Sequence, residues 1–197
     1  MRDRHEEVIV LVDGRLDEDI KLSTFETSLL PAPEYILNGT AGPDGQQLGE
    51  VILRFEEILQ SERPDVLLVR GGSNGALAAA LAASQFGTQV AHLHAGERCF
   101  NRRELEEVHR LVTDHLSGLH LCSTRPAIRH LASEGIVGSV YWVGDALIDY
   151  LEWAGPLADE QSDVTARYRL VPQEYVLACI GRRGNLGVRG FAAQSNK

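Results

Sequence analysis

Short apolar runs alternate with amphipathic segments along most of this chain, and this alternation constrains the fold more than any other feature. The runs predict strands that are buried on both faces, at residues 7–12, 65–69, 88–95, 118–123 and 139–144. Helices are expected between them, at residues 44–62, 76–84, 104–116, 126–133 and 146–153. This order of elements predicts an α/β fold with a doubly wound parallel sheet.

Two stretches depart from the alternation. Residues 26–45 contain three prolines and three glycines, and we interpret them as a connector. The pattern weakens again after Pro156, where residues 174–180 predict one more strand and residues 181–197 have no apolar period. We therefore expect one domain in residues 1–155, and in residues 156–197 the start of a missing second domain followed by a disordered tail.

Composition narrows the classes of protein that the chain can belong to. The net charge of −9 over 197 residues argues against a nucleic-acid-binding surface, which needs clustered Lys and Arg. Cys99, Cys122 and Cys179 are widely spaced, as reduced thiols in a cytoplasmic protein are. Residues 1–7 contain no apolar signal region, and no run approaches the roughly 20 residues that span a bilayer. We expect a cytoplasmic protein without membrane partners.

Polar residues follow the expected strands at their carboxyl ends, where open α/β sheets bind ligands. These are residues 14–21, 70–75, 92–103 and 144–145. The glycines in residues 71–75 are typical of a tight turn or of a backbone that approaches a ligand. In the helix expected at residues 104–116, Glu106 and Arg110 are four residues apart and are expected to pair. That pair is either a solvated ion pair or a carboxylate placed for proton transfer.

Histidines in the strand expected at residues 88–95 allow a metal site as a minor alternative. His92 and His94 alternate and are expected to point to the same side of the strand. With Glu106 and His109 they could form a site of histidines and one carboxylate. Scattered histidines are more often satisfied polar groups, so we expect no metal and no cofactor.

Five motifs in order resemble the non-hydrolysing UDP-N-acetylglucosamine 2-epimerases. They are PDVLLVRGG, AHLHAGERCF, LEEVHRLVTDHLS, LHLCSTRPAIRHLASEGI and VYWVGDALID, and the match runs from about residue 35 to 153. The resemblance implies the Rossmann-like N-terminal domain of a two-domain fold. It also implies interconversion of UDP-GlcNAc and UDP-ManNAc by removal of the C2 proton, elimination of UDP and its re-addition.

This chain has the family's residue at some motif positions and a different residue at others. The resemblance implies Glu106, His94 and Lys21 as catalytic residues, although His94 stands where the family has a glutamate. It implies contacts to substrate from Gly14, Glu18, Gly71, Arg98, Glu107, Arg110, Arg182 and Arg183. Leu16 replaces a loop arginine, Gly72 a catalytic aspartate and Gly181 a histidine.

Three hypotheses follow from this mixture. In the first hypothesis the chain is a weak epimerase. Glu106 and His94 would then carry protons, and the cations would be Lys21, Arg98 and Arg110. Alternatively, it is a non-catalytic module that binds a sugar nucleotide or has a regulatory role, or it is a truncated remnant. The expected partners are a UDP-sugar and either a second copy or a full-length epimerase.

Overall fold

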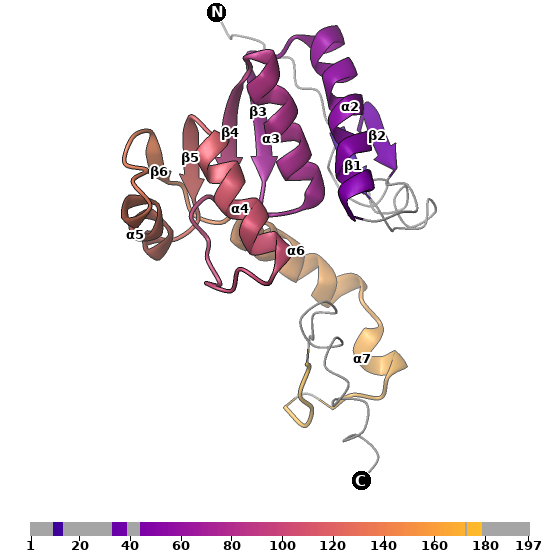
Figure 1. Cartoon of the computed structure of the whole chain (residues 1–197). Coiled ribbons are helices and arrows are strands. Elements are labelled where there is room, and N and C mark those ends of the chain that lie inside the picture. The colour runs from indigo at the N-terminus through magenta and orange to yellow at the C-terminus, as the bar shows by residue number, and fades with distance from the viewer. Residues whose placement is uncertain (1–9, 14–32, 39–43, 172, 179–197) are drawn as a thin grey trace, which may run out of the picture. The chain divides into compact units, whose positions relative to one another are not determined.

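The computed structural model describes residues 10–13, 33–38, 44–171 and 173–178 (Figure 1). It divides into two compact units, Met1–Gly144 and Asp145–Lys197. The expected domain boundary after residue 155 stays a prediction, as does the expected tail, because residues 179–197 lie outside the described part.

The main sheet of the first unit has four parallel strands in the order of the sequence: β3 (Val66–Arg70), β4 (Gln89–Leu93), β5 (Leu119–Cys122) and β6 (Val140–Trp142). The helices α3 (Asn74–Phe86), α4 (Leu105–Leu116) and α5 (Arg125–Ser133) connect them. The predicted α/β class with a parallel sheet is therefore confirmed. Register places His92 of β4 beside His120 of β5.

Two further strands form a separate parallel pair, β1 (Val10–Asp13) with β2 (Tyr35–Asn38). The interpretation of residues 26–45 as a connector is wrong for β2. Its sequence, Tyr-Ile-Leu-Asn, begins with aromatic and β-branched residues that favour strands despite the nearby prolines. The helix α2 (Asp44–Glu62) leads from this pair to the main sheet.

An alanine-rich helix fills the centre of the first unit. Ala78, Ala80, Ala82 and Ala83 of α3 are fully buried, and their small side chains allow the helix to approach α2 and the sheet closely. The Ser73 hydroxyl caps the start of α3 by accepting from the Ala76 amide at 3.1 Å. A second apolar cluster, formed by Ala95, Cys122, Ala127 and Leu131, holds α5 on the sheet.

The second unit contains α6 (Ala146–Gln161) and α7 (Val164–Arg167). The helix α6 passes through Pro156 and ends beyond the expected residue 153. The strand predicted at residues 174–180 is wrong for its described part, since residues 175–178 adopt no regular structure. Val176 and Leu177 are 94% and 86% exposed, and no described strand pairs with them. Among the described residues, no helix is long and apolar enough to cross a membrane.

Gly96 allows α5 to pack against the chain that leaves β4. Its φ is +76°, and a Cβ atom there would lie 2.3 Å from the Ala127 carbonyl oxygen. We expect Gly96→Ala to lower the free energy of unfolding by more than about 2 kcal/mol, through backbone strain and overpacking. Urea unfolding measures this loss. Gly135→Ala is the matched control, because Gly135 has φ +85° but open space around it. Equal losses in both variants would contradict the role given to the contact.

Candidate functional site

The loop between β4 and α4 begins with a strained residue. The strand β4 ends at Leu93, and His94 has φ +66°. Alternation along a strand therefore does not apply to His94, and the expectation that His92 and His94 share one side loses its basis. The His94 imidazole lies 2.9 Å from a Glu97 carboxylate oxygen, which also accepts from the Ser123 hydroxyl at 2.8 Å. The sequence motif thus places a histidine that a carboxylate orients at the end of β4.

A buried carboxylate lies beneath this loop. Asp114 of α4 is fully buried and is 2.7 Å from Nδ1 of His92. Its other oxygen accepts from the Gly96 amide at 3.1 Å and from Nη2 of Arg98 at 2.6 Å. Burial alone would raise the pKa of Asp114, but the hydrogen bonds and charges of His92 and Arg98 lower it. The carboxylate therefore stays ionised and fixes the loop to the sheet and to α4.

Arg98, an expected substrate contact, is already neutralised within the protein. Its guanidinium donates to both carboxylate oxygens of Glu134, at 2.8 and 2.6 Å, in addition to Asp114. The Glu97 carbonyl oxygen accepts a further bond at 2.9 Å. The Arg98 side chain is 1% exposed. In this conformation it has no free face for a diphosphate.

In the first turn of α4, two glutamates that are adjacent in the sequence have opposite environments. Glu107 is buried and accepts from the amides of Cys99 and Phe100, at 3.0 and 2.9 Å. Burial raises its pKa, but these amides and Arg110 outweigh that effect, and the pKa is lowered. Glu106 is exposed.

Arg110 pairs with a different glutamate from the one expected. Its Nη2 lies 3.2 Å from Oε2 of Glu107, so the predicted pairing with Glu106 is wrong. Both spacings, three and four residues, place side chains on one helix face, and burial of Glu107 selects it. The exposed carboxylate of Glu106 keeps access to solvent, whereas the Arg110 side chain is largely buried, at 16% exposed.

The Gly71–Gly72 turn after β3 packs against α4 without space for a side chain. Nε2 of His92 lies 3.1 Å from the Gly71 carbonyl oxygen, and Nδ1 of His109 lies 3.1 Å from that of Gly72. A Cβ atom on Gly72 would lie 2.4 Å from the Glu106 carbonyl oxygen and 2.8 Å from Cγ of Arg110. An aspartate, which the family resemblance implies at this position, therefore cannot be accommodated unless α4 moves.

The metal alternative finds little support in this geometry. Both ring nitrogens of His92 have protein partners, and Nδ1 of His109 faces a carbonyl oxygen. Within the described ranges, no group of three His, Cys, Asp or Glu side chains is arranged to hold a metal ion. Five of the expected site residues, Gly14, Glu18, Lys21, Arg182 and Arg183, lie outside the described residues.

Sequence reasoning missed the residues that organise the site. Asp114 and Glu134 were not singled out, although Asp114 lies seven residues after Glu107 and four after Arg110. This spacing places the three charged residues on one helix face, where a buried helix normally carries apolar residues. The sequence contained that signal, whereas the contact of Arg98 with Glu134, 36 residues away, had no local signal.

The comparisons with known proteins agree on one family. Residues 1–194 match the model for UDP-N-acetylglucosamine 2-epimerase. A Methanococcus maripaludis protein named UDP-N-acetylglucosamine 2-epimerase homolog is 34% identical over 190 residues, which are 96% of this chain and 53% of that protein. A Pseudomonas aeruginosa UDP-2,3-diacetamido-2,3-dideoxy-D-glucuronate 2-epimerase is 37% identical over 146 residues, which are 73% of this chain and 41% of that protein.

Solved structures agree with the sequence matches. The crystal structure of Methanocaldococcus jannaschii UDP-GlcNAc 2-epimerase in complex with UDP-GlcNAc and UDP gives a TM-score of 0.69 at 37% identity. The match covers 74% of this chain and 40% of that one. The described fold is thus that of a Rossmann-like N-terminal domain, and this chain spans about half the length of the relatives it matches.

The buried Asp114 predicts a stability that depends on pH. We expect Asp114→Asn to cost about 3–5 kcal/mol at pH 7, because Arg98 and His92 lose a buried charged partner. Since the folded pKa is lowered, this contribution is fully present above the ordinary value of 3.8 and is lost as the pH falls below it. Urea unfolding at several pH values measures the free energy of unfolding of the parent chain and of the variant. The two stabilities should converge in acid, and a constant difference would contradict the assignment. Asp163→Asn, in an exposed pair with Arg167, is the control expected to change little.

The close packing around Gly72 predicts that a substitution there also lowers the stability of the chain. Gly72→Ala should destabilise the chain by about 1–3 kcal/mol, since α4 must shift to admit the methyl group. Thermal unfolding followed by circular dichroism measures the effect. Gly138→Ala is the matched control, because nothing lies within 4 Å of a Cβ atom there. A neutral Gly72→Ala would show that the turn and α4 are not in close contact.

Proposed function

Because this chain belongs to the UDP-N-acetylglucosamine 2-epimerase family, we propose that it binds the acylated amino-sugar part of a UDP-sugar without exchanging the proton at C2. The observation that carries this proposal is the close packing of Gly72 against α4. The position of the family's aspartate has neither the carboxylate nor the space for one, since the α4 backbone would lie 2.4 Å from a Cβ atom. The loss of one member of an acid–base set costs about 10²–10⁴-fold in rate.

The internal pairing of the cations supports the same proposal. Departure of UDP requires positive charge that is free to meet the diphosphate. In the described residues, Arg98 is paired with Asp114 and Glu134, and Arg110 with Glu107. Lys21, Arg182 and Arg183 remain proposed contacts to substrate, as do Gly14, Glu18 and Gly71. The sugar is thus proposed to bind at the carboxyl ends of the strands with little assistance to UDP elimination.

A second candidate function, weak epimerase activity, is favoured by the geometry of His94. The Glu97 carboxylate orients its imidazole at 2.9 Å, as a general acid–base histidine requires. The strained φ of +66° places this ring beyond the strand end, and such strain occurs often at functional sites. In this alternative Glu106 carries the other proton.

The wider setting is also a proposal. The family suggests a cytoplasmic protein of amino-sugar metabolism or polysaccharide biosynthesis, and the glycine at position 72 favours a pseudoenzyme. A second copy of this chain or a full-length epimerase is the proposed protein partner. The P. aeruginosa relative is named for a diacetamido-glucuronate, so a uronate sugar nucleotide belongs in any test beside UDP-GlcNAc.

Proton NMR in D₂O separates the candidates. With purified chain and UDP-GlcNAc, we expect the sugar H2 signal to persist while saturation transfer from protein to sugar protons reports binding. Loss of H2 with the parent chain but not with Glu106→Ala would overturn the proposal in favour of weak catalysis. Absence of both exchange and saturation transfer, with either sugar nucleotide, would overturn it in favour of a remnant.

Two further variants sharpen the same measurement. Gly72→Asp should not gain exchange, because the new side chain has no room beside α4. His94→Gln should keep the saturation transfer, because the proposal assigns binding to the strand ends as a whole. If the parent shows exchange and His94→Gln abolishes it, His94 and Glu97 become the proton-transfer pair.

A further inference from the structure

One oxygen of the Glu97 carboxylate, which we call the shared oxygen, has two hydrogen-bond partners. Nδ1 of His94 lies 2.9 Å from the shared oxygen, and the Ser123 hydroxyl donates to it at 2.8 Å. His94 and Ser123 are buried, whereas the Glu97 side chain is 40% exposed. Glu97 lies three residues after His94, which stands where the family has a glutamate. The loop therefore still contains a carboxylate, and an imidazole is bound to it.

This carboxylate determines which nitrogen of the His94 ring carries the hydrogen. An ionised carboxylate only accepts hydrogen bonds, so Nδ1 of His94 must donate to it. In the neutral ring, Nε2 then carries the lone pair. An acceptor at Nε2 is what a general base requires, and it can also accept from a hydroxyl or amide group of a sugar. The chemistry that His94 can perform thus depends on where the Glu97 carboxylate is held.

The end of β5 supplies the second attachment that Glu97 needs. Ordering a glutamate side chain costs conformational entropy, and a partly exposed pair with a histidine offsets little of that cost. The Ser123 hydroxyl adds a bond at the carboxylate end of the side chain. The same strand holds the loop backbone, because the Leu121 carbonyl oxygen accepts from the amides of His94 and Ala95, at 2.9 and 3.3 Å. The imidazole and the hydroxyl are therefore positioned by one element.

The Ser123 backbone is itself held by β6. Nε1 of Trp142 donates to the Ser123 carbonyl oxygen at 3.2 Å. The Val143 amide donates to the carbonyl oxygen of the preceding Cys122 at 3.0 Å. The Arg125 guanidinium lies over the Trp142 ring, 4.6 Å from the ring centroid, and packs against it. The hydroxyl therefore projects from a backbone that two strands keep in place.

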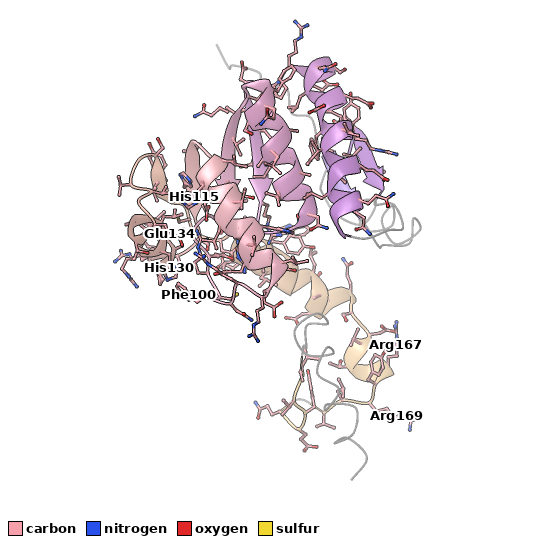
Figure 2. All side chains as sticks on the ribbon, in the orientation of Figure 1. Phe100, His115, His130, Glu134, Arg167 and Arg169 are labelled. Carbon is pink, nitrogen blue, oxygen red and sulfur yellow. The ribbon has the colours of Figure 1, made fainter. Side chains whose placement is uncertain are left out.

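The charged groups that α4 and α5 bring to the loop have other partners. Arg98 binds Asp114 of α4 and Glu134 of α5. Nδ1 of His130 lies 2.9 Å from a carbonyl oxygen of the loop, and its ring meets that of Phe100 edge-on at 5.0 Å. Figure 2 shows His130, Glu134 and Phe100 close together. Among the described residues, none of these groups forms a hydrogen bond or ion pair with the shared oxygen.

We propose that Ser123 is a positioning residue of the site. Its hydroxyl holds the Glu97 carboxylate, and Glu97 in turn keeps the His94 ring in the tautomer with its hydrogen on Nδ1. The use of the Nε2 acceptor toward a sugar rests on the proposed function. The tautomer does not, because the contacts that fix it are formed in the chain without a ligand.

Nitrogen NMR of the full chain with labelled histidines tests this proposal, because the shifts of the ring nitrogens distinguish the tautomers. In alkaline buffer, where ordinary imidazoles are neutral, the His94 signals, assigned with His94→Gln, should show mainly the Nδ1–H form. Ser123→Ala should lower the ratio of this form to the Nε2–H form by about threefold to tenfold, the effect of losing one hydrogen bond. Ser123→Thr keeps a hydroxyl and should restore the ratio. Trp142→Phe removes the donor to the Ser123 backbone and should give a smaller shift in the same direction.

Matched controls keep the result specific. Ser133→Ala removes a hydroxyl that donates to the His130 carbonyl oxygen at 2.7 Å, and it should leave the His94 tautomer unchanged. The rings of His109 and His130 serve as internal references, because Nδ1 of each faces a carbonyl oxygen, at 3.1 and 2.9 Å. Their signals should stay the same in every variant if the fold is retained.

Two results would overturn the proposal. One is a parent chain in which His94 carries its hydrogen on Nε2. The other is an unchanged His94 tautomer in Ser123→Ala; if that variant disturbs the reference signals, an unchanged tautomer in Trp142→Phe decides in the same way. Saturation transfer from UDP-GlcNAc is measured separately, so its absence would overturn the proposed function without affecting the assignment of Ser123.

Discussion

The site depends on one buried carboxylate. Asp114 joins a strand, a loop and a helix, because His92, the Gly96 amide and Arg98 all converge on it. An ionised group without water around it is stable only when such donors surround it, so each partner must keep its place. Glu134 then neutralises the remaining charge of Arg98 from the end of α5. This network fixes the position of the loop that contains His94 and Glu97.

The same network explains why α4 exposes three of its apolar residues. The face with Glu107 and Asp114 must point inward to meet the loop amides and Arg98. A helix has only one inner face, and Leu105, Val108 and Val112 therefore lie outside. Interactions that build the site on one side of α4 thus create an unpaired apolar stripe on the other.

Close packing of glycines decides what chemistry the site can hold. Gly72 rests against the α4 backbone, and His109 ties its carbonyl oxygen to the helix. The position is therefore part of the packing between β3 and α4 and offers no functional group. Glu106 stays exposed one residue away from the buried Glu107, so adjacent carboxylates have opposite environments. Binding without proton exchange is the behaviour that these contacts favour.

The sequence by itself determined the alternation of strands and helices, the parallel α/β class and the family, because apolar period and motif order are local properties of the chain. It also placed His94, Glu106, Glu107 and Arg110 near one strand edge. Only the tertiary structure decided that β2 forms within the proline-rich stretch and that residues 175–178 do not form a strand, since strands need a partner. It also decided that Arg110 pairs with Glu107, that Arg98 is neutralised and that α4 turns its charges inward. Helical period fixes which residues share a face, but residues distant in sequence determine which face is buried.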